Sequence, residues 1–202
     1  MTWVLFDYGG VICEHQREAD QELLAAAAGG TLQAFRDSYW AYRLDYDRAK
    51  LSCVTFWQKV GADLGRSYSA AEIAELNRLD IASWMHLQAG TVALIEDLAA
   101  AGHRLALLSN APVEVAAAVV ALPVAAHFEH CAFSCYLPAA KPEPECFLTV
   151  LAQLGAGPAD VIFVDDRPEN VTGAELLGIR GVRFTGADQT RAALASHGVT
   201  TE

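Results

Sequence analysis

Three apolar segments of this sequence are each followed by side chains that can do chemistry. Asp7 follows WVLF, the pair Ser109 and Asn110 closes RLALLSN, and Asp165 and Asp166 close VIFVDD. Each alone has a simpler explanation, because Asp, Ser and Asn often end a strand or cap the next helix. Together they combine a carboxylate nucleophile with donors and acceptors that can hold an oxyanion or a metal ion.

A lysine and a glycine pair extend this set. Lys141 lies in AAKPEPE, directly before Pro142, which can start a helix, and Gly9 and Gly10 follow Asp7. A single lysine is usually solvated, but one beside an anion site supplies a point charge. Glycines let backbone amides come close to a phosphate. Each of these five sites has a simple explanation alone, but their occurrence together is much harder to dismiss.

The segments that must position these side chains alternate between strands and helices. Short apolar runs predict four buried parallel strands, at residues 3–6, 104–109, 161–166 and 181–184. Helical spacing fills the intervals at residues 91–102, 142–155 and 168–178. We therefore predict an α/β fold with a doubly wound, Rossmann-like parallel sheet. Ligands of such sheets gather beyond the carboxyl ends of the strands, where the polar residues fall.

Residues 14–88 interrupt the alternation with segments that all have helical character. We predict an α/β core domain of residues 1–13 and 89–202 and an inserted α-helical cap domain of residues 14–88. Within the cap, aromatic residues at helical spacing predict a buried stripe that includes Phe35 and Tyr39. Arg43 and Asp47 are four residues apart and are expected to pair on a solvated face.

Charge and composition bound the partners. The net charge of this 202-residue chain is −11, which argues against nucleic acid or an anionic membrane surface as a partner. No apolar run has the length that spans a bilayer, and no secretory leader precedes the first predicted strand. Five cysteines without a CxxC pair predict neither a disulfide framework nor a zinc site. We expect a cytoplasmic protein with reduced thiols.

The ordered motifs resemble those of the haloacid dehalogenase superfamily. They are Asp7 in FDYGGVI, Ser109 in LALLSNAP, Lys141 in AKPEPECF and the acidic pair in VIFVDDRPENV. The resemblance spans nearly the whole chain and implies that family's core, with a cap inserted after the first motif. Within the cap, YWAYRLDYDRAKLSCVTFWQKVGADLG further resembles bacterial enzymes akin to α-D-glucose-1-phosphate phosphatase.

The resemblance also implies roles for individual residues. Asp7 would be the nucleophile that forms an aspartyl-phosphate, assisted by Lys141, and Mg²⁺ would be the cofactor. The expected phosphate-binding residues are Ser109, Asn110, Lys141, Gly9 and Gly10. The expected metal ligands are Asp7, the carbonyl of Gly9, Asp166 and, directly or through water, Asp165. Asn170, one turn into the following helix, would orient the acidic pair.

Position 9 departs from the family pattern. Most phosphatases of this superfamily read Asp-x-Asp-Gly-Thr, whereas this chain reads Asp7-Tyr8-Gly9-Gly10-Val11. The second Asp of the pattern serves as general acid and base, a contribution of about 10²–10⁴ in rate. A backbone carbonyl at Gly9 can still serve a metal ion. The sequence therefore retains the nucleophile and lacks the usual proton donor.

Three functions remain open at this point. The favoured one is a Mg²⁺-dependent phosphatase that hydrolyses a small phosphorylated metabolite, with a sugar phosphate as the expected substrate. The second is a non-catalytic protein that binds or senses a phosphometabolite. The third is a 2-haloacid dehalogenase, whose Asp nucleophile needs no metal. Dehalogenases usually carry Tyr where Gly9 stands and have no need of the pair Asp165 and Asp166, whose retention favours the phosphatase.

Overall fold

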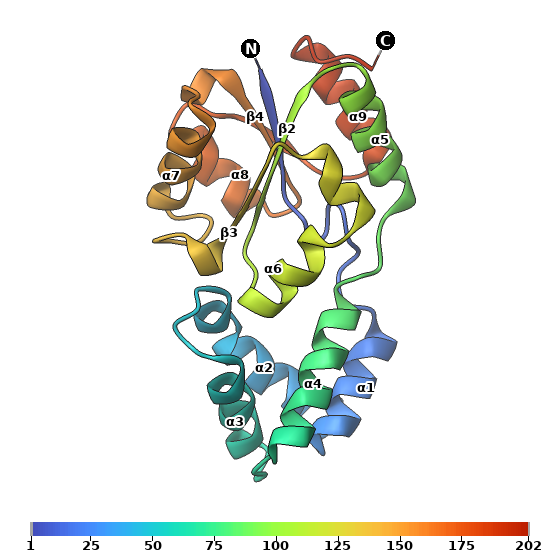
Figure 1. The fold of residues 1–202 in the computed structure, drawn as a ribbon, viewed down its shortest axis with the longest axis vertical. Coiled ribbons are helices and arrows are strands. Elements are labelled where there is room, and N and C mark those ends of the chain that lie inside the picture. The colour runs from blue at the N-terminus through green and yellow to red at the C-terminus, as the bar shows by residue number, and fades with distance from the viewer. Residues whose placement is uncertain (1, 202) are drawn as a thin grey trace.

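The computed structural model describes residues 2–201, and a parallel five-stranded sheet forms its centre (Figure 1). The strands are β1 (Trp3–Phe6), β2 (Arg104–Ser109), β3 (His130–Phe133), β4 (Val161–Asp165) and β5 (Arg180–Arg183). Their order is β3-β2-β1-β4-β5, with every pairing parallel. The α/β prediction is confirmed. The four predicted strands are present, and β3 adds a fifth, whose half-buried first residues His130 and Cys131 weaken its apolar pattern.

The register of the central strands places the polar residues at one edge of the sheet. Phe6 pairs with Leu107 of β2 and with Val164 of β4. Every residue of β1 and β4 is buried, as expected for strands covered on both faces. Asp7 and Asp165 therefore leave adjacent strands at the same level.

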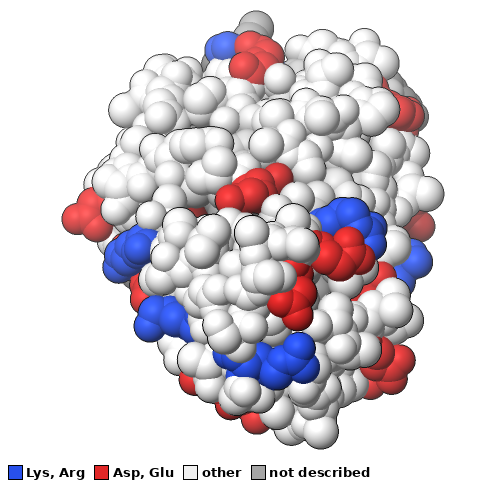
Figure 2. Space-filling model, turned by 60° about the horizontal axis from the view of Figure 1, so that its bottom comes forward, with Lys and Arg blue, Asp and Glu red and all other residues white. Residues whose placement is uncertain are grey.

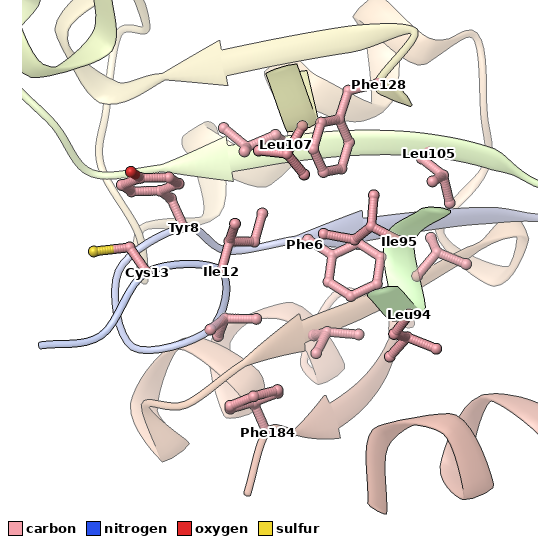
Figure 3. Packing of buried hydrophobic residues seen from close by; sticks show 14 of the residues in the cluster. Phe6, Tyr8, Ile12, Cys13, Leu94, Ile95, Leu105, Leu107, Phe128 and Phe184 are labelled. Carbon is pink, nitrogen blue, oxygen red and sulfur yellow. The ribbon is translucent and has the colours of Figure 1, made fainter. Parts of the chain in front are cut away.

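Helices cover both faces of the sheet (Figure 1). One face packs against α5 (Ala89–Ala100), α6 (Val113–Val120) and α9 (Ala187–Ser196). Figure 3 shows part of this layer, in which Phe6 meets Phe128 edge to face at 6.3 Å between ring centroids. The other face packs against α7 (Pro144–Leu154) and α8 (Pro168–Glu175). Both helices begin with a proline, which suits the first turn because it lacks the N–H that would be unpaired there.

Four helices between β1 and α5 form a separate apolar cluster at the carboxyl edge of the sheet (Figure 1). They are α1 (Glu18–Ala28), α2 (Leu32–Asp47), α3 (Cys53–Asp63) and α4 (Ala70–Ser83). Their boundaries follow local chemistry: Gly29, at φ 76°, ends α1, and the side chain of Thr31 caps the first turn of α2. We refer to this unit as the cap. The predicted domain boundaries stay a prediction.

The cap helix α2 differs from the prediction at its ion pair. Phe35, Tyr39 and Tyr46 are buried, as expected for the apolar stripe. Arg43 and Asp47 do pair, with 2.7 Å between Nε and Oδ1, but the prediction of a solvated face is wrong because both are buried. Spacing of four residues cannot distinguish the two faces of a helix, and here the pair points into the molecule.

No helix within residues 2–201 has the length and apolar character to cross a membrane. On the face drawn in Figure 2, Lys and Arg side chains lie in small groups among Asp and Glu. The absence of nucleic-acid and membrane partners stays a prediction from charge.

Candidate active site

A buried lysine bridges two carboxylates at the carboxyl edge of the sheet. Lys141 Nζ lies 2.7 Å from Asp7 Oδ1 and 2.7 Å from Asp165 Oδ2. All three residues are almost fully buried. Burial lowers the pKa of Lys141, but the two carboxylates outweigh it and the net effect is a raised pKa. The lysine is therefore a fixed cation that touches the predicted nucleophile.

Asp165 is held by a complete set of donors. In addition to Lys141, its carboxylate accepts from the backbone N–H of Arg167 at 2.8 Å and from Asn170 Nδ2 at 3.1 and 3.0 Å. The predicted contact of Asn170 with the acidic pair is thus present at Asp165. Because Asp165 is fully buried and satisfied, its geometry suits an orienting role beside a metal site.

Asp166 has a free oxygen inside the site. Its Oδ2 lies 3.1 Å from His15 Nε2, whereas its buried Oδ1 has no hydrogen-bond partner within residues 2–201. One oxygen each from Asp7, Asp165 and Asp166 lie within 4.8 Å of one another. Burial raises the pKa of Asp166, and the neighbouring Asp165 raises it further.

The same crowding affects Asp7. Burial raises the pKa of Asp7 well above its ordinary value, Lys141 opposes that rise, and Asp165 adds to it. Three carboxylates thus crowd into one space, and two of them contact Lys141. The available ligand atoms are all oxygens, and together they carry an excess of negative charge. They therefore fit a hard divalent cation such as Mg²⁺. The orphaned Oδ1 of Asp166 is where such an ion finds an unused ligand.

Asn110 locks the lysine loop onto β2. Its Nδ2 donates to the carbonyl of Lys141 at 2.9 Å, and its Oδ1 accepts from the backbone N–H of Lys141 at 3.0 Å. Asn110 was expected to bind phosphate, and this role of its side chain in holding the loop of Lys141 was missed. Ser109 is buried beside it, lines the same cavity, and its hydroxyl has no partner within residues 2–201. A phosphate oxygen is a suitable acceptor for that hydroxyl.

The two glycines after Asp7 have different surroundings. Gly10 has φ +77°, a left-handed conformation, and a β-carbon there would lie 2.7 Å from the carboxylate carbon of Asp166. Gly9 has no positive φ, and a β-carbon there would point at the ring of Trp84, 3.4 Å from Cζ3. Gly10 thus permits close approach of the loop to Asp166, whereas Gly9 accommodates an aromatic ring.

These residues line a cavity of about 510 Å³ between the sheet edge and the cap. The core contributes the polar floor: Asp7, Gly9, Ser109, Asn110, Lys141, Asp166 and Asn170 all line it. The cap contributes Trp40, Arg43, Leu44, Asp47 and Trp84, and His15 lies in the connection to the cap. The expected site residues include none of these cap residues: Arg43 and Asp47 were expected to form a solvated pair, and no local motif marks Leu44 or Trp84.

Three polar contacts fasten the end of α2 to the core. The hydroxyl of Ser134, in the short 3-10 helix η2 (Ser134–Tyr136), donates to the carbonyl of Asp47 at 2.6 Å. Tyr46 donates to Glu114 of α6 at 2.9 Å, and Arg48 pairs with Glu143 before α7. The chain passes between the core and the cap twice, at residues 7–17 and 84–88. These two connections and the three contacts together hold the cap over the cavity.

Comparison with known proteins identifies the family. A model of haloacid dehalogenase-like hydrolases matches residues 1–178. The chain belongs to this family. It is a hydrolase by that membership, and the sequence resemblance is confirmed at family level. The narrower likeness to glucose-1-phosphate phosphatases is not confirmed by these comparisons.

Two curated relatives share part or most of the sequence. The chain is 34% identical over 110 residues to flavin mononucleotide hydrolase 1 of Arabidopsis thaliana, a chloroplast protein, covering 54% of this chain and 45% of that one. The match thus spans less than half the length of that relative. Sesquiterpene phosphatase astK of Aspergillus oryzae is 24% identical over 186 residues, covering 90% of this chain and 88% of that one.

Solved structures of the family share the fold. A haloacid dehalogenase family enzyme of Bacteroides thetaiotaomicron, solved as a magnesium complex, superposes with a TM-score of 0.79 at 22% identity over 96% of this chain and 98% of that one. L-2-haloacid dehalogenase of Xanthobacter autotrophicus superposes with a TM-score of 0.71 at 19% identity over 99% and 84%. At these identities the likeness establishes architecture, and the chemistry must be argued from the site.

Proposed function

We propose that this chain is a Mg²⁺-dependent phosphatase that hydrolyses a small phosphorylated metabolite through an aspartyl-phosphate on Asp7. One observation carries the proposal: three carboxylates meet in one site, Lys141 contacts two of them, and Asp166 Oδ1 is left without a hydrogen-bond partner among residues 2–201. A buried excess of negative charge is costly unless a cation compensates it. A bound phosphate dianion adds further negative charge, so a compensating cation is needed still more when substrate is present.

The residues of the site support each step. The carboxylate oxygen of Asp7 attacks phosphorus, and the bond to the leaving oxygen breaks with its electron pair. Lys141 donates to Asp7 and can remain in contact with the phosphoryl oxygens as charge builds on them. Water then attacks the aspartyl-phosphate, which releases inorganic phosphate and regenerates Asp7. Ser109 offers its free hydroxyl to a phosphoryl oxygen throughout.

Asp7, Asp166 and the carbonyl of Gly9 are the groups that would hold Mg²⁺, with Asp165 oriented behind them by Asn170. When bound, the ion supplies positive charge to the non-bridging oxygens of the phosphate. Asp165 faces Lys141 and Asn170, which supports an indirect role for it.

The comparisons support the phosphatase over the other two functions. Both curated relatives are named for hydrolysis of phosphate compounds, and a structural neighbour was solved with magnesium. A dehalogenase shares the fold too. The carboxylate cluster favours the phosphatase, because displacement of halide needs no cation of this kind. A sugar phosphate, the substrate expected from sequence, stays a prediction.

The test is phosphate release from aryl and alkyl phosphates, with halide release from 2-chloropropionate measured in parallel. We expect turnover of phosphates in the presence of Mg²⁺, loss of turnover in excess chelator, and loss by several orders of magnitude in Asp7→Asn. Asp188→Asn, which alters an exposed carboxylate on α9, is the matched control and should keep full activity. Phosphate release that survives Asp7→Asn or chelation, or halide release in its place, would overturn the proposal.

A further inference from the structure

The cap side of the cavity is a wall of apolar side chains. Trp40 and Leu44, one turn apart on α2, and Trp84 at the end of α4 all line it. Trp40 is 51% exposed and Leu44 49% exposed, although both are large apolar residues. The rings of Trp40 and Trp84 stand perpendicular, with centroids 6.5 Å apart. Exposed apolar surface that faces a binding cavity indicates an apolar ligand rather than a polyhydroxylated one.

The polar groups of the cap are bonded to one another, including Arg43 and Asp47, which also line the cavity. Arg43 is 4% exposed and contacts Asp80 at 3.1 Å as well as Asp47. Tyr39 donates to Asp80 at 2.6 Å, and Gln16 donates to Ser83 at 2.8 Å. A polyhydroxylated leaving group needs several accessible hydrogen-bond partners, because its hydroxyls lose water when the cap closes. Most cap groups able to serve are committed elsewhere.

The charge of this cluster also disfavours a second anion. Arg43 is the single cation, and the carboxylates of Asp47 and Asp80 both contact it. The trio is therefore not a binding site for a further phosphate or carboxylate on the leaving group. The hydrogen bonds that Arg43 makes within residues 2–201 use Nε and Nη1, so Nη2 can donate to a neutral acceptor.

We propose that the substrate's leaving group is an uncharged apolar group that packs against Trp40, Leu44 and Trp84. The proposal rests on the proposed phosphatase function and names the substrate class of that same site. The polar floor holds the phosphate, and the apolar wall holds the organic part. A cavity of about 510 Å³ accommodates a phosphate with an organic group of small-metabolite size. Aromatic rings and branched aliphatic chains share the required chemistry.

The decisive measurement compares esters whose leaving oxygens are alike. Benzyl phosphate, cyclohexylmethyl phosphate and glucose 6-phosphate all release a primary alcohol, so differences in kcat/KM report the pocket rather than leaving-group acidity. We expect both apolar esters to exceed glucose 6-phosphate at least about tenfold. The better of the two identifies an aromatic or an aliphatic source. Glucose 6-phosphate turned over as well as both would overturn the proposal.

A charged analogue and two variants complete the test. Benzyl phosphate with a para-carboxylate should be at least about tenfold poorer than benzyl phosphate itself, and equal turnover would contradict the uncharged class. Trp40→Ala should lower the preference for benzyl over glucose 6-phosphate toward unity. Leu23→Ala, an equally exposed apolar position on α1 away from the cavity, should leave that preference unchanged.

The outcomes separate this proposal from the function it rests on. If no phosphate ester is hydrolysed, including p-nitrophenyl phosphate, the phosphatase function itself fails. If p-nitrophenyl phosphate is hydrolysed and the apolar preference is absent or insensitive to Trp40→Ala, the phosphatase stands and the apolar substrate class is wrong.

Discussion

Trp84 packs its indole against Gly9, at the position where most family phosphatases carry the aspartate that donates a proton. A β-carbon on residue 9 would meet Cζ3 of the ring at 3.4 Å, an ordinary contact distance. Gly9 also has no left-handed backbone conformation that would exclude a side chain. The backbone of the loop therefore does not require glycine at position 9. The residue there lacks a carboxylate, and the ring of Trp84 covers it.

Restoring a carboxylate at this position should help poor leaving groups most. Gly9→Asp should raise kcat/KM for benzyl phosphate, which leaves as an alkoxide, by up to about 10²–10⁴ and change phenyl phosphate much less. Both esters are aromatic, so both meet the same apolar wall. Gly9→Asn matches the size without a transferable proton and should give no gain. Equal wild-type turnover of the two esters would mean that another group already donates the proton.

Removing the central lysine should cost both activity and stability. The structure places the ammonium group of Lys141 between two buried carboxylates. Lys141→Ala should therefore lower the free energy of unfolding by about 3–5 kcal/mol, as for other broken buried pairs. Urea unfolding without added metal measures it.

Asp7→Asn provides the matched comparison. It removes one of the three crowded carboxylates and leaves Lys141 paired with Asp165, so the stability should hold or rise. If Lys141→Ala loses activity while its unfolding midpoint stays at the wild-type value, the carboxylates are not held by that ion pair.

The sheet and the polar floor of the site were predictable from sequence for one physical reason. Parallel strands covered on both faces are apolar throughout, so β1, β2 and β4 stand out as short runs. Their carboxyl ends must meet at one edge, which brings Asp7 and Asp165 together without any knowledge of side-chain positions. β5 was equally evident, whereas β3 lacks a clean apolar run.

The cap side of the site was not predictable in the same way. Trp84 reaches Gly9 across 75 residues of sequence, and nothing beside either residue signals that contact. Arg43 and Asp47 have the same spacing whether their helix face is wet or buried, so only the packing of α2 on α4 decides. Asn110 was recognised, but which of its polar groups acts depends on how the loop of Lys141 folds back. Long-range packing, which local pattern does not encode, determined each of these.

Gly10 should be irreplaceable for a reason beyond its backbone conformation. Gly10→Ala faces both the strain of φ +77° and overlap with the Asp166 carboxylate. Gly102→Ala faces similar strain at φ +82° with no atom within 4 Å of the new carbon, so it should cost only about 1–2 kcal/mol. Gly10→Ala should cost more, and should lower kcat/KM over tenfold because Asp166 must move. Equal unfolding free energies and activities of the two variants would show that the loop relaxes away from Asp166.

The buried carboxylate of Asp47 should contribute a free energy of unfolding that decreases as the pH rises. Burial raises the pKa of Asp47 from 3.8 to about 6, although Arg43 opposes the rise. A raised folded-state pKa means that the stability contribution is fully present below about pH 4 and is lost as the pH rises through about 6. Two charged groups face Asp47. Arg43 on the same helix contacts it directly, and Asp80 on α4 contacts Arg43. The contribution of Asp47 to the free energy of unfolding should fall across this window.

Asp47→Asn isolates that effect, because the amide oxygen can still accept from Arg43 but cannot ionise. The difference in unfolding free energy, variant minus wild type, should grow in favour of the variant between pH 4 and pH 7, by at most about 3 kcal/mol. Titration of every other group largely cancels in this difference. Asp45→Asn, at an exposed position on the same helix, should give a flat difference. A flat profile for Asp47→Asn as well, or one of opposite slope, would mean that Arg43 keeps the buried carboxylate ionised at little cost.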